Sequence, residues 1–183
     1  MRRVPMVFLA ALGLAALSCG AHAQVKVIGG GLAGDCSLQA LNGDHSAETV
    51  KTCTDALNFE TLTRETAART LVNRGVIYMR RRQFMEAERD FSRAQGLTPD
   101  LPEIYVDRGV ALIRQNRWSE AVAELTRGIQ LSPYEPEKAY FDRGLARDAL
   151  ADYSGAYADF SRASELKPDW PQPKNELKRY VVR

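Results

Sequence analysis

A glycine-rich stretch near the N-terminus has residue types and spacing that could bind a phosphate group. The stretch from Gly29 to Gly34 matches the pattern G-x-G-x-x-G and follows a β-like run at residues 25–28. Such a loop can hold a pyrophosphate at a helix N-terminus, which is the chemistry of a dinucleotide-binding enzyme. That site also needs a parallel sheet and a second strand ending in an acidic residue, and the downstream sequence indicates neither. We therefore interpret residues 24–34 as a flexible Gly-rich leader, with the dinucleotide-binding enzyme as the weaker alternative.

The first 23 residues predict a secretory signal peptide. Arg2 and Arg3 form a positive n-region, residues 7–17 are apolar, and Ala21-His22-Ala23 fits an A-x-A cleavage site. The apolar run is too short to cross a membrane, and we expect no membrane span elsewhere. Cleavage after Ala23 would release the chain into the periplasm of a bacterium.

A second interpretation of the N-terminus is a lipid anchor. Residues 16–19 loosely resemble a bacterial lipobox and end at Cys19. In that case the protein would be a lipoprotein held at the membrane through Cys19.

Cys36 and Cys53 are predicted to form a disulfide bond, because an even number of cysteines in an exported chain indicates pairing. Residues 36–41 predict a short helix, residues 42–45 a turn, and Ser46 the N-cap of a second helix. The two cysteines are equally far from the centre of the turn, so an antiparallel hairpin over residues 35–63 brings them face to face. Closing a loop of this size stabilises it by roughly 3 kcal/mol in the chain-entropy model.

Charge and histidine content exclude several classes of function. Removal of residues 1–23 lowers Lys+Arg from 25 to 23, which equals the 23 acidic residues, so nothing indicates a nucleic-acid partner. The mature chain keeps one histidine, His45, in a polar turn, whereas a zinc site or a His-based catalytic pair needs more ligands or partners. We expect no metal, no cofactor and no enzymatic activity.

The remaining sequence repeats one pattern three times, at intervals of 34 and 35 residues. Each copy has a glycine, then an aromatic residue nine positions later, an alanine, an aromatic residue or leucine, and a proline. The copies are Gly75, Phe84, Ala87, Phe91 and Pro99; Gly109, Trp118, Ala121, Leu125 and Pro133; and Gly144, Tyr153, Ala156, Phe160 and Pro168. Glycine and alanine allow two helices to approach closely, and proline ends the second helix.

These residues resemble bacterial tetratricopeptide repeats, and the strings 73–75, 107–109 and 142–144 are similar to the N-R-G variant of that family. The resemblance implies an all-α, right-handed solenoid of three helix-turn-helix repeats at residues 68–101, 102–136 and 137–170, within a region that starts at residue 64. The expected helices cover residues 64–81, 84–97, 102–115, 118–131, 137–150 and 153–166. The disulfide-stapled hairpin would precede them, and a short capping helix within residues 171–183 would cover the open apolar edge with Leu177, Tyr180 and Val181.

The resemblance also implies a partner-binding groove along the first helices of the repeats. The groove positions of the family correspond to Asn73, Val76, Arg80, Asp107, Val110, Arg114, Phe141, Asp142 and Leu145. Family members that bind chaperones hold a carboxylate with Lys and Asn where this chain has Val72 and Val76, so we do not expect that activity. For the apolar positions, packing between neighbouring first helices remains an equal alternative.

Three arginine–acid pairs recur at a spacing of 16 residues, namely Arg74 with Asp90, Arg108 with Glu124, and Arg143 with Asp159. We interpret them as structural ion pairs between the two helices of each repeat.

The sequence as a whole predicts a non-enzymatic protein–protein interaction scaffold, exported to the periplasm, that binds a peptide or partner helix. The alternative is a lipoprotein accessory subunit of an envelope complex, anchored through Cys19.

Overall fold

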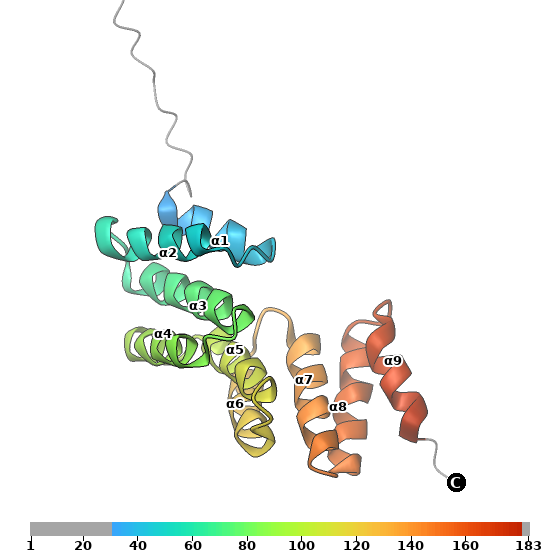
Figure 1. The fold of residues 1–183 in the computed structure, drawn as a ribbon. Helices are drawn as coiled ribbons and strands as arrows, with labels where there is room; N and C mark the ends of the chain where they lie inside the picture. The colour runs from blue at the N-terminus through green and yellow to red at the C-terminus, as the bar shows by residue number, and fades with distance from the viewer. Residues whose placement is uncertain (1–30, 181–183) are drawn as a thin grey trace, which may run out of the picture.

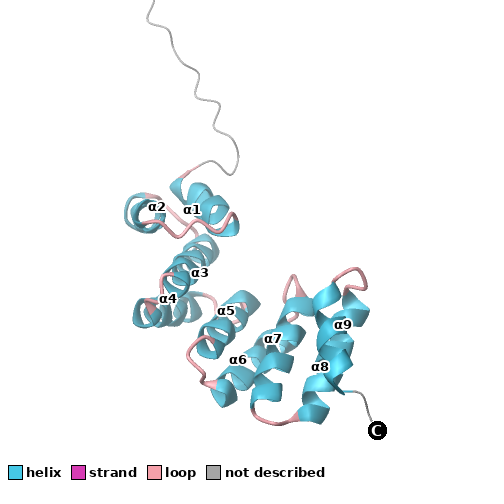
Figure 2. Ribbon diagram, turned by 45° about the vertical axis from the view of Figure 1, so that its right-hand side comes forward, coloured by secondary structure: helices cyan, strands magenta, loops and turns pink. Residues whose placement is uncertain are grey.

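The computed structural model of the chain describes residues 31–180, so the predicted signal peptide, Cys19 and residues 24–30 lie outside the described part. Within it, all regular elements are helices joined by turns (Figure 2). They are α1 (Leu32–Leu41), α2 (Ala47–Phe59), α3 (Arg64–Arg80), α4 (Phe84–Leu97), α5 (Pro102–Ile113), α6 (Trp118–Gln130), α7 (Pro136–Ala149), α8 (Tyr153–Leu166), α9 (Pro171–Leu177) and the 3₁₀ turn η1 (Lys178–Tyr180).

The helices form antiparallel pairs that stack along one direction (Figure 1). Helices α3 and α4 are repeat one, α5 and α6 repeat two, and α7 and α8 repeat three. The pair α1–α2 packs on α3 at one end, and α9 packs on α8 at the other. The predicted all-α solenoid with an N-terminal hairpin and a short C-terminal cap is therefore confirmed.

A bulky side chain placed against a glycine joins the two helices of each repeat. A Cβ atom added at Gly75 would lie 2.7 Å from Cε1 of Phe91, so only glycine lets the ring approach α3 this closely. Gly144 faces the Phe160 ring in the same way, and Gly109 faces the side chain of Leu125. Phe91, Leu125 and Phe160 are all fully buried.

Buried ion pairs add a second link within repeats one and three. Arg74 donates from Nε and Nη2 to the two oxygens of Asp90 at 2.7 and 2.8 Å. Arg143 makes the same two-point contact with Asp159 at 2.9 and 2.7 Å. These predicted pairs are confirmed, and such forked contacts are among the strongest hydrogen bonds in proteins.

Repeat two departs from this pattern. The predicted ion pair of Arg108 with Glu124 is present, with Arg108 Nη1 3.5 Å from the carboxylate, but it forms no hydrogen bond. Arg108 Nη1 donates to Gln95 Oε1 at 3.2 Å instead. Arg108 Nε and Glu124 Oε2 are buried and lack a hydrogen-bond partner. Burial raises the pKa of Glu124, because the Arg108 charge only partly offsets it.

The α1–α2 pair occupies the position of a preceding repeat. Arg74 on α3 donates to the hydroxyl of Thr54 on α2 at 2.9 Å, just as Arg143 on α7 donates to Thr126 on α6 at 3.1 Å. Thr126 follows Leu125 in the sequence, and Thr54 follows Cys53. Cys53 is therefore equivalent in position to Leu125, the side chain that packs against the glycine of its repeat. In the α1–α2 pair, a cysteine takes the position that a phenylalanine or leucine has in the repeats.

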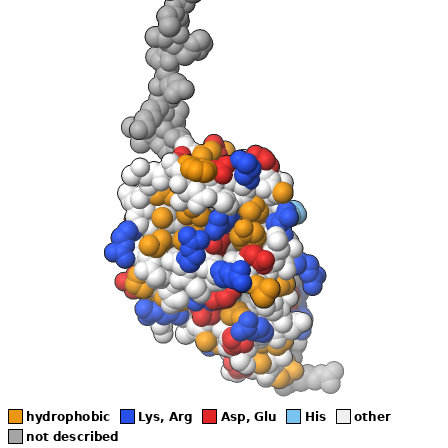
Figure 3. Space-filling model, turned by 60° about the vertical axis from the view of Figure 1, so that its left-hand side comes forward, with side chains coloured by type: hydrophobic (Ala, Val, Ile, Leu, Met, Phe, Trp, Pro, Cys, Tyr) orange, Lys and Arg blue, Asp and Glu red, His pale blue; other side chains and the backbone are white. Residues whose placement is uncertain are grey.

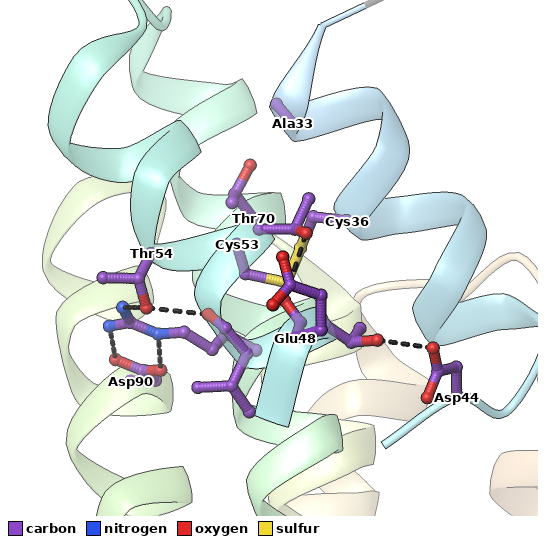
Figure 4. The surroundings of a disulfide bond; sticks show 12 residues. Ala33, Cys36, Asp44, Glu48, Cys53, Thr54, Thr70 and Asp90 are labelled. Atoms are coloured by element: carbon purple, nitrogen blue, oxygen red, sulfur yellow. Dashed lines mark hydrogen bonds and ion pairs between the residues drawn. A yellow bond between two sulfur atoms is a disulfide. The ribbon is translucent and has the colours of Figure 1, made fainter. Parts of the chain in front are cut away.

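The predicted disulfide is confirmed: Cys36 and Cys53 are bonded, with their Cα atoms 4.9 Å apart, and both are fully buried between α1 and α2 (Figure 4). Two arginines connect this unit to repeat one. Arg80 donates to the carbonyl oxygen of Ala40 at 2.6 Å, and Arg81 donates to that of His45 at 2.9 Å.

The predicted leader was too long by three residues, because α1 starts at Leu32. The Glu60 carboxylate accepts hydrogen bonds from the backbone N–H groups of Leu32 at 2.6 Å and Ala33 at 3.0 Å. A carboxylate at this place satisfies free N–H groups and complements the helix dipole. Gly31 leaves room for it, since a Cβ there would lie 2.6 Å from Glu60 Oε1.

The C-terminal cap covers the end of repeat three with an aromatic side chain. The Tyr180 ring lies 6.1 Å from the ring of Phe160, and its hydroxyl donates to Asp148. Arg179 also pairs with Asp148 at 3.0 Å. Leu177 is half-buried, and Val181 lies outside the described residues.

Candidate partner-binding groove

The first helices of successive units adjoin one another in the order α1, α3, α5 and α7. We call the surface that these four helices share the inner face. It includes α1, which the sequence did not place there, so the predicted groove gains a fourth helix at its N-terminal end.

An open cavity of about 580 Å³ lies at this end of the inner face. Its walls come from the start of α1, the α2–α3 connection and the first half of α3, and their side chains are mainly small and polar. The lining residues are Gly31, Ala33, Gly34, Ser37, Glu60, Thr61, Leu62, Thr66, Arg69, Thr70 and Asn73. Of the nine predicted groove residues, Asn73 alone lines this cavity.

The polar groove residues have three different environments. Arg80 holds the last turn of α1 through Ala40, so its guanidinium is already engaged within the chain. Arg114 is exposed at the end of α5. Asp107 and Asp142 are half-buried on α5 and α7.

The environments of the two aspartates change their acidity. Burial, together with the charges of Glu103 and Asp142, raises the pKa of Asp107 to about 7. Burial also raises the pKa of Asp142 to about 6, although Lys138 and Arg114 oppose the change. Both groups therefore titrate close to neutral pH, which is common among residues at functional sites.

The apolar groove residues contribute to packing as well as to the surface. Val76 and Val110 are half-buried and contact the main core cluster, and Leu145 is half-buried on α7. The Phe141 ring lies between two other aromatic rings, 5.5 Å from Phe160 and 4.9 Å from Trp170. Truncating Phe141 would therefore disturb the junction of α7, α8 and α9 as well as any groove.

The described residues offer little for metal or membrane chemistry. Over residues 31–180, no group of three or more His, Cys, Asp or Glu side chains is placed to hold a metal ion. No helix in the same range combines the length and apolarity needed to cross a bilayer. Figure 3 shows one face of the molecule, on which basic, acidic and apolar side chains are interspersed.

In the described part of the glycine motif, a carboxylate of the chain itself occupies the place where a bound anion would lie. The N–H groups at the start of α1, where the motif would place a pyrophosphate, bind the Glu60 carboxylate. The structure thus gives no support to the dinucleotide-binding interpretation. Sequence reasoning missed Glu60 because its contact spans 28 residues; the one available signal was a glycine directly before a helix.

Comparisons with known proteins agree with the architecture. A scan against protein-family models found no match, and neither did a search of curated proteins. Among solved structures, the TPR domain of Arabidopsis OM64 is 26% identical, with a TM-score of 0.60 over 64% of this chain and 96% of that one. The first TPR of Spaghetti (RPAP3), bound to the HSP90 peptide SRMEEVD, is 27% identical, with a TM-score of 0.60 over 63% and 93%. The crystal structure of MamA, at 19% identity, has a TM-score of 0.64 over 78% and 80%.

Proposed function

Because this chain is a solenoid of three tetratricopeptide repeats, we propose that it is a non-enzymatic adaptor that binds a peptide or a partner helix on its inner face. The observation that supports this most directly is the open cavity between α1 and α3, which continues the face formed by α5 and α7. Two similar solved structures are bound to peptides: an HSP90 peptide on the first TPR of Spaghetti (RPAP3), and an HSP70 peptide on the second TPR domain of human RPAP3. An open cavity with polar walls, next to the apolar side chains of the rest of the inner face, suits such a ligand.

The partner is to be identified by cross-linking and pull-down from the native envelope, and the site by a pair of matched variants. Asn73→Arg places a long side chain in the cavity, whereas Gln130→Arg makes a similar change at an exposed position of α6. We expect Asn73→Arg to weaken binding by about tenfold or more and Gln130→Arg to leave it unchanged. Equal binding by both variants would place the partner elsewhere on the molecule.

We propose that the protein works in the periplasm after cleavage at Ala23. This rests on the signal-peptide pattern and agrees with a buried disulfide, which persists in oxidising compartments. The lipoprotein alternative predicts a different mature N-terminus. Mass spectrometry of protein from the native envelope separates a chain that begins at Gln24 from one that begins at acylated Cys19.

A further inference from the structure

Two aspartates on the inner face have no partner among the residues that the structure describes. Asp107 and Asp142 each lie two residues before the glycine of their repeat, and repeat one has Asn73 at the same position. Within residues 31–180, neither carboxylate accepts a hydrogen bond or lies within 4.0 Å of a cationic nitrogen. By contrast, the aspartates between the helices of repeats one and three are held by forked arginine contacts.

These two aspartates form one cluster across neighbouring helices. The charged groups that face Asp107 are Glu103 on its own helix, Arg80 on α3, and Asp142 and Lys138 on α7. Asp142 is faced by Lys138 on its own helix and Arg114 on α5. The charge of Asp142 is one of those that raise the pKa of Asp107, which places the two carboxylates near each other.

Two of the three nearby cations are engaged with other groups, and the third, Arg114, is exposed at the end of α5. Arg80 donates to the Ala40 carbonyl oxygen at 2.6 Å, and Lys138 donates to Glu135 at 2.6 Å. A half-buried carboxylate without a hydrogen-bond partner destabilises the fold, and a ligand cation that reached it would remove that cost. The two carboxylates therefore offer free acceptors to a ligand cation at this point, with Val110 and Leu145 nearby in sequence for apolar contact.

The peptides bound to the similar structures have the opposite character. SRMEEVD and SGPTIEEVD each carry three acidic residues at or near their C-terminal ends. Two aspartates on the inner face of this chain would repel such a sequence.

We propose that the inner face of this protein binds a peptide that carries a lysine or arginine, and that Asp107 and Asp142 accept hydrogen bonds from that basic group between α5 and α7. The proposal rests on the adaptor function above and names the chemistry of its partner. N–H donors of an ammonium or guanidinium group make short, charge-assisted bonds to carboxylates. Because the ligand requires the ionised carboxylates, its affinity rises with pH across the range in which they lose their protons.

The test uses the mature chain and a displayed library of random peptides, selected at pH 8, followed by two synthetic probes. The probes are SRMEEVD and its charge-inverted counterpart SRMKKVK, whose lysines stay charged from pH 5 to pH 8. We expect the selected peptides to be enriched in Lys and Arg and SRMKKVK to bind about tenfold tighter than SRMEEVD. Affinity for SRMKKVK should fall several-fold between pH 8 and pH 5.

The double variant Asp107→Asn/Asp142→Asn should lose the preference for basic peptides. Its control, Asp100→Asn/Asp169→Asn, removes two exposed charges and should keep that preference. Inner-face peptides without a basic residue, tighter binding of SRMEEVD, or a double variant that binds like the wild type would each overturn the inference and leave the adaptor function standing. A library that yields no peptide sensitive to Asn73→Arg would count against the adaptor function itself.

Discussion

The N-terminal unit (α1–α2) and repeat one (α3–α4) have the same antiparallel arrangement but hold their helices together by different means. In repeat one, the Phe91 ring fills the notch at Gly75, and Arg74 clamps Asp90. In the N-terminal unit, the Cys36–Cys53 disulfide joins the helices, with Cys53 at the position equivalent to Phe91. The difference follows from position: a repeat with neighbours on both sides buries its side chains fully, whereas a terminal unit has one neighbour and gains more from a covalent link.

The largest loss of stability is expected from truncating the buried Phe91 side chain, which joins the two helices of repeat one. Phe91→Ala should destabilise the protein by about 3–5 kcal/mol, because it empties a fully buried site that α3 cannot collapse to fill. Urea denaturation followed by circular dichroism measures this loss. Ser92→Ala, at the exposed neighbouring position, is the control. A loss below about 1 kcal/mol for Phe91→Ala would mean that the ring in the notch is not what joins the helices.

Removing the disulfide should have a smaller and more local effect. The double variant Cys36→Ala/Cys53→Ala should lower the stability of the α1–α2 unit by about 3 kcal/mol. Hydrogen exchange read by mass spectrometry should show faster exchange in α1 and α2 and unchanged exchange in α7 and α8, since coupling along a solenoid is between neighbours. Uniformly faster exchange along the chain would contradict the separation of the two regions.

The inner-face aspartates distinguish repeats two and three from repeat one, which has Asn73. The pKa of Asp107 is raised to about 7, whereas that of an unfolded aspartate is about 3.9, so between these values the folded protein binds more protons than the unfolded chain. The contribution of Asp107 to stability therefore falls as pH rises through this window. Asp107→Asn should match the wild type near pH 4 and exceed it by about 2 kcal/mol at pH 8, which is about half of what the full pKa shift gives, because the half-buried carboxylate keeps some contact with water.

Denaturation curves at the two pH values measure this difference, and Asp169→Asn serves as the exposed control. An advantage of Asp107→Asn that was equal at both pH values would show that the carboxylate is not buried in the way described.

The smallest effect concerns the start of α1. Glu60→Gln should destabilise α1 by about 1 kcal/mol, because an amide complements the helix N-terminus less well than a carboxylate. Hydrogen exchange in residues 32–41 measures the loss, and Asp100→Asn, which removes an exposed charge, should not change it. Unchanged protection in both variants would mean that Glu60 is not needed for α1 to begin at Leu32.

Most of the fold could be predicted because its key contacts recur at a fixed spacing. The ladder of glycine, aromatic residue and proline placed α4 and α8 at their observed bounds and the other repeat helices within two residues. The symmetry of the turn around residues 42–45 sufficed to pair Cys36 with Cys53. These features depend on local periodicity, which is visible in one sequence.

The remaining features depend on long-range contacts, which the periodicity of the sequence does not reveal. Glu60 reaches back 28 residues to start α1, and Arg80 reaches back 40 residues to its end. Asp107 and Asp142 were predicted as groove residues. That they lack partners among residues 31–180 could not be predicted, because it depends on where the neighbouring cations point. The stacking of Phe141 with Trp170 was likewise hidden, because it required the path of the chain into α9.

An arginine of each repeat donates a hydrogen bond to a side chain of the unit before it. These contacts bear on how the solenoid could be lengthened. Arg143 of repeat three donates to the hydroxyl of Thr126 in the unit before it, whereas Arg108 of repeat two donates to Gln95 of repeat one. A tandem duplication of residues 102–136 would present Thr126 to both arginines that follow it. Copying repeat two would therefore extend the solenoid with each following arginine facing a hydroxyl, and gene duplication or design could use that boundary.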